Sequence, residues 1–311
     1  MRYDMDLDEI LAKVAKDDRS GASGTLDYVI GDLLDHLETG ARADPEAWKC
    51  FALELQRLRA TMAPIFHLSN AILLACESEE PDLPARIRAD LAGLRDRERR
   101  ASAVLSRNAA VSLPGTRFLT VSSSGSVTSS LLELGSRRRI SVVVMESLPG
   151  GEGKHAAELL SREGIEVELV RDSMAFDRAR SCDAGVCGAD SMSPAGVVNK
   201  VGTYVLASAC AEAGIPCLLL ASWGKCMPIH APNHMVTERV EGAIKYREQV
   251  FETVPLSRFQ TCINERGAVP AEDMIADLES MRLAEAWGER VQRGFPTSRP
   301  SQRRHSCARP S

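Results

Sequence analysis

Several residues between positions 190 and 203 carry groups that bind sugars and anions. Asp190 ends the apolar run AGVCGAD, where a carboxylate could accept a proton or a hydrogen bond from a substrate hydroxyl. Asn199 and Lys200 follow, and we predict that they open a helix that continues through Gly202 and Thr203. The free N–H groups of such a helix, together with the lysine ammonium, favour an anion. The alternative is structural, with Asp190 capping the next turn and Lys200 solvated.

A second set of polar groups lies in the serine-rich segment 122–126. The segment follows the apolar run RFLTVS and begins the next helical segment. Hydroxyls and a glycine at a helix N-terminus suit a phosphate group. Serine and glycine are also ordinary loop residues, so both interpretations stay open. The candidate phosphate ligands are Ser122, Ser123, Ser124, Gly125 and Ser126.

The segment 149–154, PGGEGK, is similar to a phosphate-binding loop but does not meet its requirements. Leu148 stands where that motif has its first glycine, and His155 stands where it has the Ser or Thr that holds magnesium. We therefore exclude nucleotide hydrolysis by such a loop.

Cys226, His230 and His234 are zinc-type ligands that follow one another at intervals of four residues. Prolines between them prevent a regular helix that would align them, and a fourth ligand is missing. We therefore expect no metal and no other cofactor.

From about residue 116, strand-like and helical segments alternate. The strand-like runs are apolar on both faces, as in a parallel sheet that is covered by helices on each side. Ligands of such sheets bind beyond the carboxyl ends of the strands. This pattern predicts an α/β fold with a Rossmann-like, doubly wound parallel sheet. The predicted strands are 117–122, 140–146, 167–172, 184–190 and 217–222.

The first part of the chain, from residue 7 to about residue 107, has helical periodicity. Its apolar positions recur at intervals of three and four, as on one face of a helix. We predict an N-terminal helical domain over residues 1–110 and a Rossmann-like ligand-binding domain over residues 111–293. The tail 294–311 is rich in Arg, Ser and Pro, a composition typical of disorder.

The composition is that of a soluble globular protein, with 44% hydrophobic and 26% charged residues among 311. The net charge of -5 argues against general nucleic-acid binding. No apolar run reaches the roughly 18–20 residues that a membrane span needs, and the N-terminus lacks a secretory apolar segment. Nine scattered cysteines are typical of reduced, buried thiols in a cytosolic protein. We expect a cytoplasmic protein with no membrane and no direct nucleic-acid partner.

The order of four motifs resembles that of one protein superfamily. The motifs are MES-x-P-x-x-EG, GIEVELVRDS, GADSMSPAGVVNKVGT and GIPCLLLAS. The superfamily unites the alpha, beta and delta regulatory subunits of translation initiation factor 2B with methylthioribose-1-phosphate isomerase and ribose-1,5-bisphosphate isomerase. The resemblance covers about residues 116–270. It implies a helical N-terminal domain, a Rossmann-like C-terminal domain, and dimers or larger homo-oligomers built through the latter.

The resemblance also implies roles for particular residues. Isomerases of this group convert a cyclic aldose 1-phosphate into the open ketose 1-phosphate, and they use a cysteine and the aspartate of the GAD motif. Asp190 matches that aspartate, and Asn199 and Lys200 match the substrate-contacting pair. Ser122 stands at the position of the cysteine. A serine hydroxyl is a poor proton shuttle unless a base activates it.

Further departures affect groups that hold the substrate in the isomerases. Their E-T-R-P sequence is Glu146-Ser147-Leu148-Pro149 here, which keeps the candidate ligand Glu146 and loses the arginine. Their R-G-A sequence is Ser20-Gly21-Ala22 here, with Arg19 one place away. The segment 61–64 replaces a second arginine-bearing stretch.

Three functions from different classes follow. The first is a regulatory-subunit-like protein that binds a phosphorylated sugar or nucleotide in a retained isomerase-type pocket without turnover, and whose other partners would be itself and related subunits. The alternative is a divergent aldose–ketose sugar-1-phosphate isomerase with Asp190 as the acid/base. A third function, a purely structural partner in a larger complex, predicts that altering Asp190 changes nothing measurable. The departures at Ser122 and Leu148 favour the first.

Overall fold

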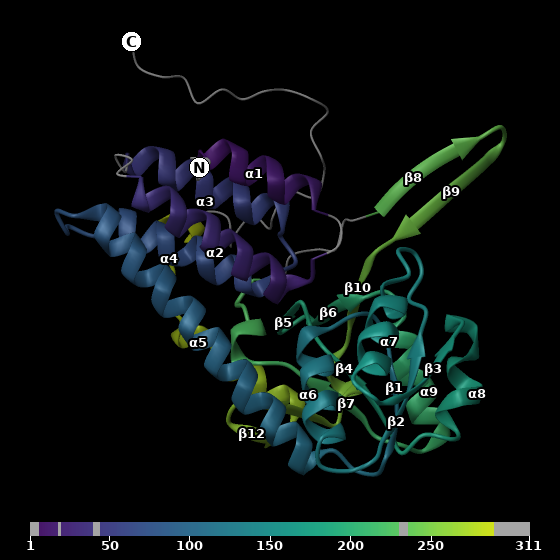
Figure 1. The fold of residues 1–311 in the computed structure, drawn as a ribbon. Helices are drawn as coiled ribbons and strands as arrows, with labels where there is room; N and C mark the ends of the chain where they lie inside the picture. The colour runs from purple at the N-terminus through teal and green to yellow at the C-terminus, as the bar shows by residue number, and fades with distance from the viewer. Residues whose placement is uncertain (1–5, 18–19, 40–43, 230–235, 289–311) are drawn as a thin grey trace.

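A computed structural model of the chain describes residues 6–17, 20–39, 44–229 and 236–288. A bundle of helices forms the first part and a layered α/β unit forms the second (Figure 1). The long helix α5 (Leu83–Ser112) begins in the bundle and continues along the α/β unit, where it packs against α6 (Gly125–Gly135). The predicted order, helical first and α/β second, is confirmed.

Local sequence signals start several helices of the bundle. The side chains of Asp6, Asp44 and Asp82 each accept a backbone N–H of the helix that follows. A proline also stands in the first turn of three of the helices, where its missing N–H costs nothing. The remaining helices of the bundle are α1 (Leu7–Lys16), α2 (Ala22–Glu38), α3 (Pro45–Leu58) and α4 (Ala63–Cys76).

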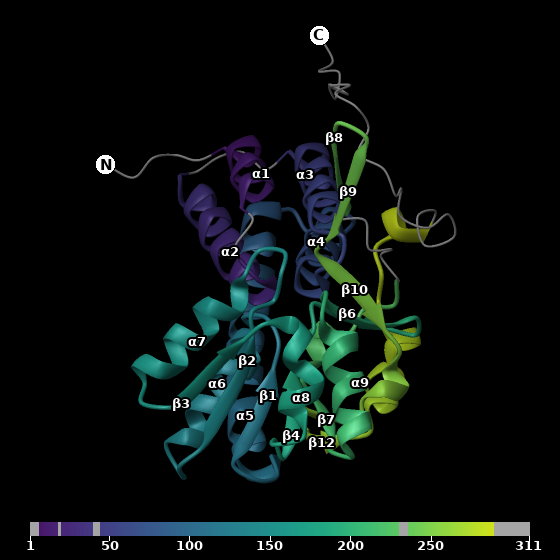
Figure 2. The ribbon, with the colours of Figure 1, turned by 90° about the vertical axis from the view of Figure 1, so that its right-hand side faces the viewer.

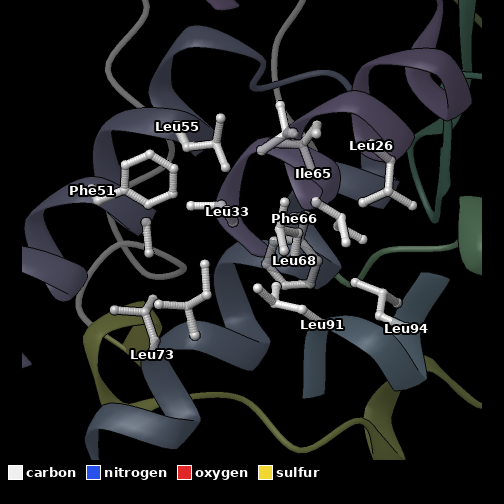
Figure 3. Close-up of a cluster of buried hydrophobic side chains, with 14 of the residues drawn as sticks. Leu26, Leu33, Phe51, Leu55, Ile65, Phe66, Leu68, Leu73, Leu91 and Leu94 are labelled. Atoms are coloured by element: carbon white, nitrogen blue, oxygen red, sulfur yellow. The ribbon is translucent and has the colours of Figure 1, made fainter. Parts of the chain in front are cut away.

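One apolar core holds the bundle together (Figure 3). Leu33, Leu55 and Phe66 meet there from three helices, and Leu91 of α5 joins them; all four side chains are completely buried. Trp287, near the end of the described chain, packs on Phe66 with 5.2 Å between the ring centroids. The end of the α/β unit therefore returns to the bundle, and apolar burial joins the two parts.

The α/β unit is built on a seven-stranded sheet. Its strands are β1 (Arg117–Thr120), β2 (Ser141–Met145), β3 (Glu166–Val170), β4 (Ala184–Cys187), β7 (Cys217–Leu220), β11 (Thr261–Asn264) and β12 (Gly267–Val269). They lie in the order β12-β11-β7-β4-β1-β2-β3, and all pairs except β11–β12 are parallel. The five predicted strands are β1, β2, β3, β4 and β7. The chain runs outward from β1 to β3 and then outward the other way from β4, so the order reverses between β1 and β4. Ligands bind at such a topological switch point.

Helices cover both faces of this sheet (Figure 2). Phe118 of β1 points toward α5, α6 and α7 (Glu152–Arg162), whereas the next residue, Leu119, points toward α8 (Ala175–Ala179) and α9 (Thr203–Ala213). Successive residues of a strand face opposite sides, which explains why the predicted strands are apolar throughout. The doubly wound, Rossmann-like prediction is confirmed.

A second, antiparallel sheet corrects one prediction. It consists of β5 (Ser191–Ser193), β6 (Gly196–Lys200) and β10 (Phe251–Val254) in the order β10-β6-β5. Asn199 and Lys200 were predicted to open a helix, which was wrong: they end β6, and α9 begins only at Thr203. Lys200 pairs with Phe251, a residue about fifty positions away. Local periodicity cannot reveal such a partner, and tertiary pairing decides the conformation.

A hairpin extends from the α/β unit beyond this small sheet (Figure 1). Its strands are β8 (Val236–Glu241) and β9 (Ile244–Gln249), and within the described ranges each pairs only with the other. Some predictions concern residues outside the described ranges. These residues are Arg19, His230, His234 and the tail 294–311. Among the helices of the described ranges, none is long and apolar enough to cross a membrane.

The contact between α7 and β2 predicts that alanine substitutions at two glycines have different effects on stability. A Cβ at Gly153 would lie 1.9 Å from the carbonyl oxygen of Met145, a backbone atom that cannot move aside. We expect Gly153→Ala to lower the free energy of unfolding by about 1–3 kcal/mol, the usual cost of overpacking. At Gly31 of α2 a Cβ meets nothing within 4 Å, so Gly31→Ala should be neutral or stabilise by up to about 1 kcal/mol. Urea unfolding measures both, and equal stability of the two variants would contradict the expectation.

Candidate functional site

The carboxyl ends of β1 and β4 bring the serine-rich segment and the GAD segment together. The strands are direct neighbours, so the residues that follow them meet at the switch point. A Cβ at Gly188 would lie 2.2 Å from the Oγ of Ser124. Only glycine allows this approach without a shift of the serine. The sequence predicted both segments separately, and the structure places them in contact.

The backbone of Ser122 is held by the loop that follows β2. Ser122 has φ 68°, and its N–H donates to the Oγ of Ser147 at 2.7 Å. The N–H groups of Ser147 and Leu148 in turn donate to the two carboxylate oxygens of Asp172, at 2.7 and 2.8 Å. A left-handed backbone at a serine persists only where its surroundings impose it. These bonds therefore orient the segment at the position of the family cysteine.

The serine-rich segment leads directly into α6. Ser124 is the N-cap of that helix, but its side chain makes no capping hydrogen bond. Ser123, Ser124 and Ser126 are half-buried and Gly125 is exposed. N–H groups and hydroxyls at a helix N-terminus that opens at the switch point can bind a phosphate.

Asp190 lies where both parts of the molecule meet. Its backbone carbonyl accepts the N–H of Ala63, the first residue of α4, at 3.0 Å. Asp190 keeps a small exposed fraction, yet protein groups surround its carboxylate, and this burial raises its pKa. The ammonium of Lys225 and the N–H of Ala22 at the start of α2 act in the opposite direction and favour the ionised form. A carboxylate with a raised pKa beside cationic groups can exchange protons or orient hydroxyls.

Lys225 is the member of the site that the sequence prediction missed. Its side chain is buried, and its Nζ donates to the Oγ of Ser23 in α2 at 3.0 Å. Burial lowers the pKa of Lys225, while Asp190 and Glu98 of α5 raise it. Lys225 follows the carboxyl end of β7, so the rule that ligands bind beyond strand ends could have selected it.

Glu98 completes the group of buried charges. Burial raises its pKa, and Lys225 is the largest influence that lowers it. A Cβ at Gly224 would lie 1.9 Å from the Oε1 of Glu98, so the glycine makes room for this carboxylate. Ser222 lies near its other oxygen, with the Oγ at 3.4 Å from Oε2.

Lys200 and Asn199 have internal partners. The Nζ of Lys200 bonds to the Oε1 of Glu152 at 2.8 Å and to the carbonyl oxygen of Pro149. Only 3% of the Lys200 side chain is exposed. The amide of Asn199 donates to the hydroxyl of Thr203 at 2.9 Å. Glu152 largely neutralises the charge of Lys200. Lys200 therefore holds the loop after β2 in place and attracts an anion only weakly.

Glu152 itself offers a free acceptor at the site. Its Oε2 is buried and has no hydrogen-bond partner among the described residues. The charge of Glu152 also acts on Asp190 and raises the pKa of that group. A buried oxygen without a donor is costly unless a ligand or water supplies one.

The N-terminus of α9 was expected to attract an anion, and an internal carboxylate already lies there. The N–H groups of Gly202 and Tyr204 both donate to the Oε1 of Glu252 at 2.8 Å. Glu252 belongs to β10, and no sequence pattern predicts that this strand lies beside the helix. Gly202 and Thr203 therefore shape the helix start and do not present it to a ligand.

Glu146 lies at the edge of the site. Its carboxylate forms an ion pair with Arg171, and its carbonyl oxygen accepts the N–H of Gly153 at 3.2 Å. Ser20, Gly21 and Ala22, at the position of the family R-G-A sequence, lead into α2, whose first N–H faces Asp190. The structure thus brings that N-terminal segment to the site and leaves Glu146 paired elsewhere.

No group of side chains able to hold a metal ion occurs in the parts of the chain that the structure describes. Cys226, one of the zinc-type ligands considered, is buried, and this burial raises the pKa of its thiol well above the usual value. The imidazole of His67 in α4 is neutral at pH 7, because burial lowers its pKa to about 4. Its Nε2 lies 2.8 Å from the carbonyl oxygen of Cys226.

Comparison with known proteins identifies the family. The profile described as "Initiation factor 2 subunit family" matches residues 4–271, and the chain belongs to this family. A putative translation initiation factor eIF-2B subunit 2-like protein of Pyrococcus horikoshii is 35% identical over 143 residues, 44% of this chain and 52% of that protein. The ribose 1,5-bisphosphate isomerase of Archaeoglobus fulgidus is 30% identical over 148 residues, 43% of this chain and 47% of that enzyme. The chain thus spans about half the length of these curated relatives.

Solved structures agree with the fold. The translation initiation factor eIF-2B of Pyrococcus horikoshii OT3 superposes with a TM-score of 0.76 and 26% identity, over 86% of this chain and 98% of that one. The 5-methylthioribose 1-phosphate isomerase of the same organism has a TM-score of 0.69 and 20% identity, over 89% and 88% of the two chains. At that identity the likeness shows the fold alone. The resemblance expected from the motifs is confirmed for the family, which includes proteins named as initiation factors and as isomerases.

The buried charges predict how Lys225→Met alters stability. Without the ammonium, the carboxylates of Asp190 and Glu98 lose a cationic neighbour. We expect the free energy of unfolding at pH 7 to fall by about 1–3 kcal/mol, the cost of an uncompensated buried polar group. Adding Asp190→Asn should recover part of this loss. Urea unfolding of the single and double variants measures the effect, with Lys154→Met, at an exposed lysine, as the control.

The sign of the pH dependence follows from the raised pKa of Asp190. In Lys225→Met this folded-state pKa rises further above the unfolded value. The stabilisation from the protonated group is complete below the unfolded pKa of about 3.9 and is lost as pH rises through the folded value. The loss of stability should therefore be smaller near pH 4 than at pH 7. A loss that does not change over this range would contradict the assignment.

Proposed function

We propose that this protein is a cytoplasmic, regulatory-subunit-like member of its family that binds a phosphorylated sugar or nucleotide at the switch point without turnover. One observation carries the proposal: Asp190 and the buried Lys225 follow the strand ends and act on each other's pKa, and Gly188 of the Asp190 segment closely approaches Ser124 at the start of α6. A phosphate fits the start of α6, and hydroxyls of a sugar fit the carboxylates of Asp190 and Glu152.

Several features favour recognition over catalysis. Ser122 replaces the cysteine. The hydrogen bond described for Ser122 runs from its backbone N–H to the Oγ of Ser147, so it holds the backbone and does not activate the hydroxyl as a base would. Leu148 stands in place of an arginine and is 51% exposed. Lys200 is already paired with Glu152. A site with these groups keeps hydrogen-bond partners for a ligand but lacks the proton shuttle of the isomerases.

The alternative function, a divergent aldose–ketose isomerase of sugar 1-phosphates, rests on the raised pKa of Asp190. Raising the pKa of a carboxyl toward neutrality suits an acid/base that moves a proton between two carbons. In that case Asp190 would do the chemistry and Ser122 would position the substrate.

Ligand titration tests the proposal. We expect calorimetry to detect binding of at least one compound among ribose 1,5-bisphosphate, methylthioribose 1-phosphate and nucleoside monophosphates. Asp190→Asn and Lys225→Met should each raise its Kd by about tenfold or more, a loss of about 1.4 kcal/mol. Lys154→Met, at an exposed lysine of α7, should leave the Kd unchanged.

An assay of ketose 1-phosphate formation separates the alternatives. No turnover is expected from the unaltered protein with either isomerase substrate. Turnover that Asp190→Asn abolishes would establish the isomerase instead. If none of the compounds binds, or if Asp190→Asn changes no Kd, the pocket proposal fails and a purely structural partner remains.

Self-association is the second part of the proposal. Helices α8 and α9 pack side by side on one face of the sheet and expose three large apolar or aromatic side chains, Phe176 at 38%, Tyr204 at 38% and Val205 at 37%. Apolar side chains exposed on neighbouring helices can form part of a protein interface. One related structure is a tetrameric eIF2B-beta2-delta2 complex of Chaetomium thermophilum. We assign the α8–α9 face to a dimer of this chain.

Light scattering after size exclusion checks this interface. The unaltered protein should run as a dimer or larger species, and Val205→Glu should give a monomer because the charge would be buried in the interface. Val111→Glu changes an apolar residue that is 76% exposed on α5 and should keep the dimer. A monomeric unaltered protein, or two variants with the same mass, would contradict this assignment.

A further inference from the structure

A cavity of about 740 Å³ lies in the helical bundle, apart from the site at the switch point. It opens between α4, the connection 77–82 and α5, and Arg282 of the C-terminal segment closes one side. None of its lining residues belongs to the candidate site. Its volume falls within the range of about 300–1,000 Å³ that is usual for small-molecule sites.

The charged residues of this cavity are of two kinds. Arg86 is fully engaged, since it bonds to Asp90 at 2.8 Å and also to Glu80. Arg97 and Arg282 line the same cavity, and across the described ranges neither guanidinium has a carboxylate within ion-pair distance. Both residues are exposed, so the two guanidinium groups can hold an anion that reaches the open side of the cavity from solvent.

The backbone of α5 makes room for one of these arginines. A Cβ at Gly93 would lie 3.2 Å from the Nη1 of Arg97, so the guanidinium lies back along the helix over that glycine. Glycine in a helix interior costs about 1 kcal/mol relative to alanine. The charge of Arg97 also acts on His67 of α4 and lowers the pKa of that imidazole.

The other end of the cavity is acidic. Glu77 and Glu79 line it and have no ion pair with any described residue. They belong to the short connection between α4 and α5, which makes the two helices antiparallel neighbours. Ala71 of α4 lines the cavity six residues before Glu77, about 9 Å along the helix axis. Long arginine and glutamate side chains can reach across that separation from opposite ends.

We propose that this cavity binds a small zwitterion, an organic molecule with a phosphate or carboxylate at one end and an amine at the other. Arg97 and Arg282 hold the anionic group, and Glu77 and Glu79 hold the amine. Ala71 and Leu74 of α4 line the cavity between these charges and contact the carbon skeleton. A compound with anionic groups at both ends is disfavoured because it would place like charges against the two glutamates.

Calorimetric titration of the full chain with two pairs of probes tests the proposal. Phosphoethanolamine and 4-aminobutyrate carry both charges, whereas ethyl phosphate and butyrate carry the same anions without the amine. We expect one zwitterion to bind at least about tenfold more tightly than its amine-free partner. Whichever pair binds identifies the anion as phosphate or carboxylate.

Variants locate the binding. Arg97→Ala with Arg282→Ala should weaken the bound zwitterion by about tenfold or more, and Glu77→Gln with Glu79→Gln should remove its advantage over the amine-free probe. Arg107→Ala, at an exposed arginine of the same helix outside the cavity, should change nothing. Absence of binding by both zwitterions up to about 10 mM overturns the proposal. Equal affinity in the arginine variants, or loss of binding in Asp190→Asn, overturns it too.

Discussion

The buried ammonium of Lys225 is the group on which the rest of the site depends. A charge in that position is tolerated only because polar groups compensate it, and these come from separate parts of the chain: Asp190 beyond β4, Glu98 of α5 and Ser23 of α2. The helical bundle and the α/β unit are thus held in one relative position by charge as well as by apolar burial. Asp190 is the clearest case, since its carbonyl also receives the first N–H of α4.

The sheet and the residues at its strand ends could be predicted from the sequence for a physical reason. Each strand is a short run that must be apolar on both faces, and a parallel sheet gathers its ligand groups beyond the carboxyl ends. Ser122 and Asp190 could be predicted in this way. Lys225 obeys the same rule, but one lysine in a loop has no pattern of its own. Asn199, Lys200 and Glu252 could not be placed, because they depend on the pairing of β6 with β10 across about fifty residues.

Under the proposed function, the two halves of the candidate site have kept different amounts of their chemistry. A phosphate would meet the serine-rich start of α6, and a sugar would meet Asp190 with its raised pKa. The position of the family cysteine is taken by Ser122, whose backbone is fixed by Ser147. Recognition needs only donors and acceptors in place, whereas isomerisation also needs a group that changes its protonation state during the reaction. Membership of the family is therefore compatible with loss of turnover.

The bond between Lys225 and Ser23 gives any ligand of the candidate site a mechanical role. The groups of this site come from α2, from the strand ends and from the start of α7, so neither part of the molecule contains the site alone. A ligand that binds only the docked arrangement stabilises docking by mass action, in proportion to the logarithm of its concentration over its Kd. It would act as a reversible cross-link between the bundle and the sheet, and would suppress the local openings in which the two parts separate.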